Sequence, residues 1–395
     1  MAKILVMNTS FQNRGDALMI EAISNRLSKG NELSIAADIA VSSPRESRAY
    51  RTCLISTLPR SSPKQRIFNT AISVGSHLGS KLPLPGITTP EDIDIALDVS
   101  GYCFGDPWGM EKLDSVCRAY QRLKRAGAKV VLMPKTWGPF KKFDPRSIDA
   151  MLDYTDLVFV RDEQSKINLT EVVSKINVLK IRFAPDYTHE VLAPKPPGLA
   201  GEKLAFIIPS SRVIDSGTFG AEEYMQLLSL ARSQASEIGY RPKLLIHESS
   251  NDRKFVDQAD KMGFRSTDIE VPVNALATKS LVSTAEMVVT SRLHGLYNAL
   301  NSFIPVAVLG WSFKYREALA QYGVSECLVD ISNPIESLRE KIDMLADPIR
   351  SRELKAKMSD GKSSSRSGSE AMWDEIERLI ANQENERENL RQRDV

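Results

Sequence analysis

Short apolar runs alternate with helical patterns from the first residues of the chain onward. Residues 3–7 form an apolar run, and residues 16–27 carry apolar side chains at helical spacing after a polar loop. The same succession of apolar run and turn recurs at residues 95–99, 129–133 and 157–160. Alternating strands and helices of this kind predict a parallel sheet that is covered by helices on both faces.

The alternation is interrupted at residues 192–203, where three prolines and two glycines fall within twelve residues. This composition predicts a linker between domains. A second α/β series follows, with a helix expected at residues 221–238 and strands at 204–208, 243–247, 287–290 and 306–309. We therefore expect two α/β domains, residues 1–191 and 204–350, which face a cleft where a ligand binds.

Three further segments do not follow the alternating pattern. Residues 42–90 are rich in Ser, Arg and Pro, which predicts an insertion over the cleft. Residues 359–370, SDGKSSSRSGSE, have the composition of a flexible linker. Residues 371–390 show a strongly charged helical pattern, so residues 351–395 are expected to form a flexible linker and a charged C-terminal helix.

Composition narrows the class of protein. A length of 395 residues suggests two domains at roughly 150 residues each. The formal net charge is only +2 and the basic residues are spread along the chain, which gives no support for a nucleic-acid partner. The four cysteines, spaced far apart, are read as reduced thiols of a cytoplasmic protein: Cys53, Cys103, Cys117 and Cys327.

Membrane signals are also weak. The N-terminal apolar run is too short for a signal peptide, and no stretch reaches the roughly 18 apolar residues of a membrane span. We expect a protein without a transmembrane segment. Peripheral association with the inner face of a membrane stays compatible with the sequence.

Residues 287–314 carry the strongest sign of chemistry. The expected strand 287–290 runs into Ser291-Arg292-Leu293-His294-Gly295, and a helical pattern follows. At such a turn the free backbone N–H groups and the helix dipole favour an anion. Arg292 adds a planar fork that matches carboxylate or phosphate, and His294 adds a group that exchanges protons near neutrality. Lys314 follows the next expected strand, as a third cation at the same sheet edge.

The segment TSRLHGLYNALNSFIPVAVLG, followed by Lys314, resembles the signature of the polysaccharide pyruvyl transferase family. Other motifs resemble the family's in the same order along about 300 residues. They are Asn13-Arg14-Gly15-Asp16, Trp137-Gly138-Pro139-Phe140, Val160-Arg161-Asp162-Glu163-Gln164-Ser165, Pro185-Asp186, and His247 with Asp252.

The resemblance implies two Rossmann-like domains of the GT-B type and phosphoenolpyruvate as the donor substrate, without a cofactor. Members of the family form a cyclic pyruvate ketal across two hydroxyls of a sugar, so the acceptor would be a glycan or a lipid-linked glycan. By position, Arg292, His294 and Lys314 would form the donor site. The other positions taken as substrate-binding are Arg212, Ser291, Leu293, His247, Asp186 and Trp137.

Two residues are the candidates for catalysis. His294 is the candidate general acid, which would protonate the methylene carbon of the donor, although it could instead only bind donor oxygens. Asp16 is the candidate base towards the acceptor hydroxyl, with Asp186 as an alternative. Each carboxylate is equally typical of a helix cap or a loop hydrogen bond.

Two segments differ from the family pattern. Ser100-Gly101-Tyr102 stands where the family usually has a run of glycines, which predicts a narrower cleft and a different acceptor. Trp137 precedes the Gly-Pro pair, where it would either stack on a sugar ring or pack in the core. The four histidines show no metal-ligand spacing, so no metal site is expected.

Two other functions remain open at this stage. The first is a nucleotide-sugar glycosyltransferase of the same fold, although residues 295–303 lack the acidic residue that such enzymes commonly place on the ribose. The second is a non-catalytic scaffold for polysaccharide synthesis, against which the three cations at one sheet edge argue. The sequence leaves the acceptor sugar and the oligomeric state open.

Overall fold

The computed structural model describes residues 1–11, 13–37, 53–55, 86–142, 144–194, 196, 202–248 and 251–393. The chain forms two compact units. Unit 1 comprises Met1–Phe11, Met19–Asp186 and Gly368–Val395, and unit 2 comprises Gln12–Leu18 and Tyr187–Ser367. This division differs from the predicted one, because a short N-terminal segment belongs to unit 2 and the C-terminal residues belong to unit 1. Most of the predicted insertion at 42–90 lies outside the described residues.

Unit 1 contains a six-stranded parallel sheet with the order β2-β1-β5-β6-β7-β8. A separate two-stranded sheet pairs β3 with β4. The strands are β1 (Lys3–Thr9), β2 (Glu32–Ala37), β3 (Cys53–Ile55), β4 (Gly86–Thr88), β5 (Ile95–Asp98), β6 (Lys129–Lys135), β7 (Leu157–Val160) and β8 (Ile181–Phe183). Strands β5 and β7 are buried at every position, as the continuous apolar runs predict for a sheet covered on both faces.

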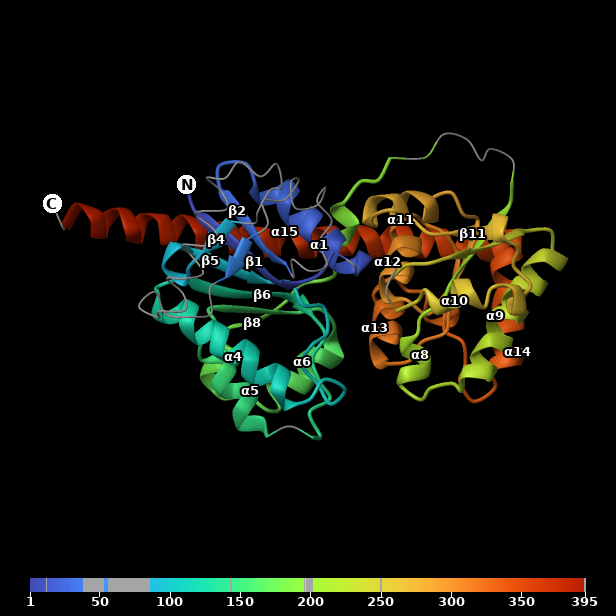
Figure 1. The fold of residues 1–395 in the computed structure, drawn as a ribbon, viewed down its shortest axis with the longest axis horizontal. Helices are drawn as coiled ribbons and strands as arrows, with labels where there is room; N and C mark the ends of the chain where they lie inside the picture. Colours follow the sequence, from blue (N-terminus) through green and yellow to red (C-terminus); the bar gives the residue numbers. More distant parts are fainter. Residues whose placement is uncertain are drawn as a thin grey trace, which may run out of the picture. The chain divides into compact units, whose positions relative to one another are not determined.

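Helices cover both faces of this sheet (Figure 1). From β1 the chain continues to β2 on one side of the sheet, whereas from β5 it continues to β6 on the other side. Because crossovers between parallel strands are right-handed, the helices of these two connections lie on opposite faces of the sheet. The helices are α1 (Arg14–Leu27), α4 (Met110–Arg125), α5 (Pro145–Leu152), α6 (Glu163–Thr170) and α7 (Lys175–Val178), with the short 3-10 helix η1 (Pro90–Asp92). Helix α1 begins in unit 2 and ends in unit 1.

Unit 2 repeats the architecture with a five-stranded parallel sheet in the order β11-β10-β9-β12-β13. Its strands are β9 (Leu204–Ile208), β10 (Arg241–Leu245), β11 (Ile269–Glu270), β12 (Met287–Thr290) and β13 (Val306–Val308). Its helices are α8 (Arg212–Asp215), α9 (Ala221–Glu237), α10 (Lys254–Asp257), α11 (Ala275–Val282), α12 (Leu293–Asn301), α13 (Phe313–Gln321) and α14 (Pro334–Ala346), with the 3-10 helices η2 (Thr188–Glu190), η3 (Asp260–Met262), η4 (Ser266–Asp268) and η5 (Ser325–Cys327). The predicted strands of both series are confirmed, and the order of each sheet is Rossmann-like.

The predicted flexible linker at residues 359–370 is wrong. These residues lie inside one continuous helix, α15 (Pro348–Arg393). Gly361, Ser365 and Ser369 are buried on the same side of the helix as Met358 and Trp373, so small residues continue the buried stripe. Residues 359–370 have a composition that is typical of a linker, yet they are helical. Their small side chains let other segments of the chain pack closely against the helix.

Within unit 2, Gly361 lets α15 approach another segment closely. A Cβ atom at this position would lie 2.6 Å from the backbone Cα of Tyr322. Within unit 1, Gly368 packs in the same way against the ring of Pro185. Among the described residues, no helix is both long and apolar enough to cross a membrane.

We predict that Gly361→Ala destabilises the protein although alanine favours a helix by about 1 kcal/mol. The added methyl group must push Tyr322 away, and overpacking of this kind typically costs about 1–3 kcal/mol. Thermal unfolding should show a lower Tm for this variant. The exposed Ser367→Ala in the same helix is the control and should not lower it. An unchanged or higher Tm in Gly361→Ala would mean that α15 does not pack here.

Candidate functional site

The carboxyl edge of the sheet in unit 2 carries most of the predicted site residues. Strands β9 and β12 are neighbours, but the chain continues from them in opposite directions, to β10 and to β13. The loops after two such strands diverge and leave a crevice, where ligands of open α/β sheets bind. Ser210 and Ser211 follow β9, and Ser291 and Arg292 follow β12.

The turn after β12 is fixed by its own backbone. The N–H of Arg292 donates to Oγ1 of Thr290 over 3.0 Å, and the Arg292 carbonyl accepts from the N–H of Leu296 as α12 begins. Every residue of α12 is buried. Leu293 belongs to the hydrophobic core of unit 2, and its predicted role in substrate binding stays a prediction.

The guanidinium of Arg292 is held by two carboxylates. Its Nε donates to Oδ2 of Asp252 over 2.8 Å, and its Nη2 donates to Oδ1 of the same side chain. Its Nη1 forms an ion pair with Glu248. The side chains of Arg292 and Glu248 are 12% and 13% exposed, whereas that of Asp252 is fully buried. Arg292 was expected to face a carboxylate or phosphate of the substrate, and in the structure Glu248 and Asp252 contact it.

The charges of this group are interdependent. Burial by itself lowers the pKa of Arg292, but the negative charges of Asp252 and Glu248 outweigh it and raise the pKa. Arg292 therefore stays positively charged. Burial raises the pKa of Asp252, and the nearby guanidinium opposes that rise.

The N-terminal segment of unit 2 packs against His294. A Cβ atom at Gly15 would lie 1.9 Å from Nδ1 of His294, so only glycine fits. The side chain of Asn13 organises this segment, because its Oδ1 accepts from the N–H of Gly15 over 3.0 Å and its Nδ2 donates to Asp16 over 2.9 Å. The structure thus brings the two predicted catalytic residues, His294 and Asp16, into neighbouring segments of the same unit.

His247 lies near enough to three basic side chains for their charges to affect its pKa. It follows β10, is 2% exposed, and its Nε2 has no hydrogen-bond partner in the described part of the chain. Burial is the largest cause of a pKa of His247 well below the usual 6.5. The positive charges of Arg292, His294 and Arg14 lower this pKa further. His247 is therefore neutral at physiological pH.

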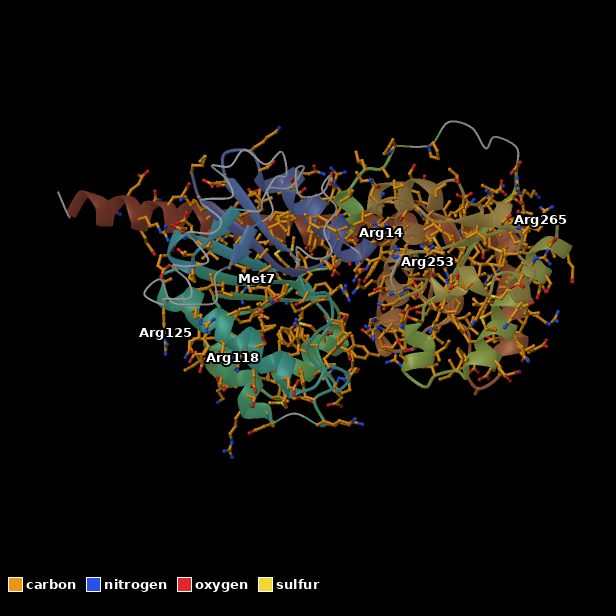
Figure 2. All side chains as sticks on the ribbon, in the orientation of Figure 1. Met7, Arg14, Arg118, Arg125, Arg253 and Arg265 are labelled. Atoms are coloured by element: carbon orange, nitrogen blue, oxygen red, sulfur yellow. The ribbon has the colours of Figure 1, made fainter. Side chains whose placement is uncertain are left out.

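Arg14 was not among the predicted site residues. Figure 2 labels this residue. It is 7% exposed, and its Nη2 donates to the carbonyl of Pro272 over 2.9 Å. Its position next to Gly15 in the loop motif was the only signal in the sequence that could have identified it.

Ser291 has a structural role. Its carbonyl accepts from the hydroxyl of Tyr315 over 2.6 Å, and its hydroxyl contacts that of Tyr224, which also accepts from the N–H of Ser210 over 3.0 Å. Both tyrosines are fully or almost fully buried. They connect α9 and α13 to the loops after β9 and β12.

Two predicted cations lie in short helices of unit 2. Nζ of Lys314, at the start of α13, lies 4.1 Å from the ring centroid of Trp311, a cation–π contact. Arg212, at the start of α8, is 41% exposed and lies 3.8 Å from Asp215. The predicted part of Arg212 and Lys314 in a donor site stays a prediction.

Trp137 and Asp186 belong to unit 1. Trp137 is fully buried and stacks on Phe104 with ring centroids 4.9 Å apart, so its ring packs in the core instead of binding a sugar. Asp186 is also buried and accepts from Nη1 of Arg161 over 3.4 Å. Arg161 in turn donates to Thr136 over 2.7 Å.

Unit 1 contains a buried polar network that the sequence analysis missed. Nζ of Lys135 lies 2.6 Å from Oδ1 of Asp98, and both side chains are fully buried. Burial raises the pKa of Asp98, but Lys135 and the surrounding hydrogen bonds outweigh it and lower the pKa. Ser100 donates its N–H to Asp98 over 2.9 Å and accepts from Lys135 over 2.8 Å. This residue, which departs from the expected run of glycines, is thus part of the network.

No group of three or more His, Cys, Asp or Glu side chains with the geometry to hold a metal ion occurs among the described residues.

Comparison with solved structures defines the class of fold. MnaA from S. aureus, solved with UDP, matches with a TM-score of 0.56 and 14% identity over 91% of each chain. HepE from Anabaena, solved with UDP and glucose, matches with a TM-score of 0.55 and 11% identity over 95% of this chain and 100% of its own. The UDP-GlcNAc 2-epimerase from Neisseria meningitidis, bound to UDP-GlcNAc, matches with a TM-score of 0.55 and 14% identity over 95% of this chain and 100% of its own. The chain is an α/β protein with two Rossmann-like domains of the GT-B type.

Comparison of the sequence defines the family. The sequence model of the polysaccharide pyruvyl transferase family matches residues 13–312. The chain therefore belongs to the polysaccharide pyruvyl transferase family, as the motifs predicted. A search of the curated proteins finds no match.

We predict that Gly15→Ala disturbs the site, because the new methyl group must displace the ring of His294. The expected loss of stability is about 1–3 kcal/mol, measured by chemical unfolding. The control is Asn25→Ala, an exposed position of the same helix, which should change stability little. Equal stability of Gly15→Ala and the wild type would contradict the packing described here.

The depressed pKa of His247 predicts a specific pH dependence. Below pH 6.5 the unfolded chain binds a proton at this residue, whereas the folded protein binds it only at a much lower pH. Stability is therefore lost as the pH falls below 6.5, by up to about 1.4 kcal/mol per pH unit from this group. Unfolding measured at pH 7.5 and 5.5 should show a smaller loss in His247→Gln than in the wild type. The same loss in both proteins would rule out this contribution.

Proposed function

We propose that the protein transfers the enolpyruvyl group of phosphoenolpyruvate to a sugar and forms a pyruvate ketal. Membership of the polysaccharide pyruvyl transferase family supports the reaction class. The observation that carries the proposal is the group of basic side chains around His247. Arg14 comes from the N-terminal segment and Arg292 and His294 from the turn after β12, and the charges of all three lower its pKa. Phosphoenolpyruvate carries roughly three negative charges in a small volume, which requires several cations held in place.

The proposed reaction begins at the methylene carbon of the donor. His294 in its protonated form delivers a proton to this carbon, and the double bond becomes a methyl group and an electrophilic central carbon. One sugar hydroxyl adds to that carbon and gives its proton to a base, for which Asp16 is the candidate. A second hydroxyl of the same sugar then bonds to the central carbon as the bond to phosphate breaks, and its proton passes to His294, which is thereby protonated again. The products are the cyclic ketal and inorganic phosphate.

Preorganisation supports these roles. Asn13 holds Asp16, and Gly15 fits against the ring of His294, so the two side chains start from defined positions. A positioned general acid is worth typically about 10²–10⁴-fold in rate. Lys314 and Arg212 are proposed as further ligands of the donor phosphate. The acceptor is proposed to be a glycan or a lipid-linked glycan, and the cytoplasmic location stays a prediction.

A nucleotide-sugar glycosyltransferase is the other function to test. The three similar structures were solved with UDP or a UDP-sugar, but at 11–14% identity this likeness concerns the fold alone. Helix α12 is fully buried and contains no acidic residue that would bind a ribose. The site residues therefore favour pyruvyl transfer.

We predict that phosphoenolpyruvate binds the wild type saturably and that Arg292→Ala lowers the affinity at least about 100-fold, because a hydrogen-bonded ionic contact of the donor is lost. Isothermal calorimetry measures both. The control is Arg265→Ala, which removes a guanidinium that is 77% exposed (Figure 2). Binding of UDP-sugars in place of phosphoenolpyruvate would reverse the assignment.

Turnover tests the chemistry. His294→Gln should retain donor binding and lose about 10²–10⁴-fold in kcat if the residue is the general acid. Weaker donor binding with an unchanged kcat would instead make His294 a donor ligand.

A further inference from the structure

The two carboxylates on Arg292 are held in different ways. Asp252 is fully buried and binds two nitrogens of the guanidinium. Its Oδ1 also accepts from the N–H of Ser211 over 3.0 Å. Glu248 is partly exposed and binds Nη1. Its carboxylate also accepts a hydrogen bond from the side-chain amide of Asn251. Asp252 is therefore the more firmly fixed partner.

The backbone of Glu248 is anchored independently of the contacts of its carboxylate. Glu248 forms an antiparallel bridge with Asn13, and its carbonyl accepts from the N–H of Asp252 over 3.1 Å. The carboxylate can leave Arg292 by rotation about its own side-chain bonds, with no change in the backbone.

The charge count makes such a departure necessary for an anionic ligand. One guanidinium and two carboxylates carry a net charge of −1. While Glu248 remains in place, Nη1 is occupied and an incoming phosphate or carboxylate meets a negative charge at short range. Once Glu248 has left, the pair of Arg292 and Asp252 has no net charge. Nη1 of Arg292 can then bind the incoming anion together with the other basic side chains near His247.

We propose that Glu248 is an internal anion that occupies Nη1 of Arg292 in the unliganded protein and is displaced by the phosphate or carboxylate group of the donor, while Asp252 remains and positions the guanidinium. This inference rests on the proposed function for the identity of the donor, but it applies to any ligand that brings an anion to Arg292.

Displacement has a measurable consequence. If Nη1 is open in only a fraction of the molecules, the apparent Kd equals the Kd of the open site divided by that fraction. Glu248→Gln keeps the shape of the side chain and removes its charge, so the open fraction increases. We expect the Kd of phosphoenolpyruvate and of inorganic phosphate to fall by about threefold to tenfold. A role of Glu248 in maintaining the fold alone would weaken binding instead.

Asp252→Asn should act in the opposite direction. The guanidinium loses its fixed partner, and we expect the Kd of both anions to rise by about tenfold or more. Because this change removes the charge of the fully buried carboxylate that binds Arg292 and leaves Glu248 as its remaining partner, loss of stability would have to be separated from loss of binding. Glu248→Asp is therefore included, since a shorter carboxylate reaches Nη1 less well and should also tighten binding, although by less than Glu248→Gln.

The experiment is calorimetric titration of the full-length protein with phosphoenolpyruvate and, separately, with inorganic phosphate. The proteins are the wild type, the variants above and the control Glu237→Gln, an exposed carboxylate in α9 of the same unit. Tighter binding in Glu248→Gln, with the control unchanged and a Tm close to that of the wild type, supports the proposal.

The outcomes separate the two proposals. If phosphoenolpyruvate binds the wild type and Glu248→Gln binds it equally or more weakly, the internal anion is rejected and the proposed function stands. If phosphoenolpyruvate does not bind but inorganic phosphate binds Glu248→Gln more tightly than the wild type, the internal anion stands and the proposed function fails. Absence of anion binding in every variant rejects the internal anion.

Discussion

The buried ion pair between Arg292 and Asp252 is the interaction on which the carboxyl edge of unit 2 depends. Asp252 follows β10, Ser211 follows β9 and Arg292 follows β12, and the carboxylate of Asp252 accepts hydrogen bonds from the other two. One side chain therefore fixes the loops of three adjacent strands. Loss of either charge would leave the other buried without its partner, at a cost of about 3–5 kcal/mol. The position of His294 and the open side of Arg292 follow from this arrangement.

Unit 1 places a comparable pair at the corresponding edge of its own sheet, with a different result. Asp98 ends β5 and Lys135 ends β6, and both are completely buried among Ser100 and Tyr120. The side chain of Arg292, by contrast, is 12% exposed. A fully enclosed pair stabilises the edge of a sheet, whereas a partly open pair can also exchange a carboxylate for a ligand. This difference in burial, rather than in residue type, favours unit 2 as the place of anion binding.

Small residues are important at two points of the structure. Gly15 leaves the space that the ring of His294 fills, and Gly361 lets α15 approach the backbone of Tyr322. In both cases the missing side chain permits a contact between segments that are far apart in the sequence. Isolated glycines and serines give little indication of such contacts, because the same residues are typical of linkers and turns.

The sequence by itself determined the alternation of strands and helices, the two α/β domains, the family and the turn that carries Arg292 and His294. These features are local: apolar runs set the strands, and a strand followed by a helix sets the turn. Only the tertiary structure decided that Trp137 and Leu293 pack in the core, that residues 359–370 are helical, and that Arg292 has two carboxylate partners. Glu248 and Asp252 lie at least 40 residues from Arg292 along the chain, so their contact depends on the parallel order of the strands, which brings the ends of β10, β9 and β12 to one edge.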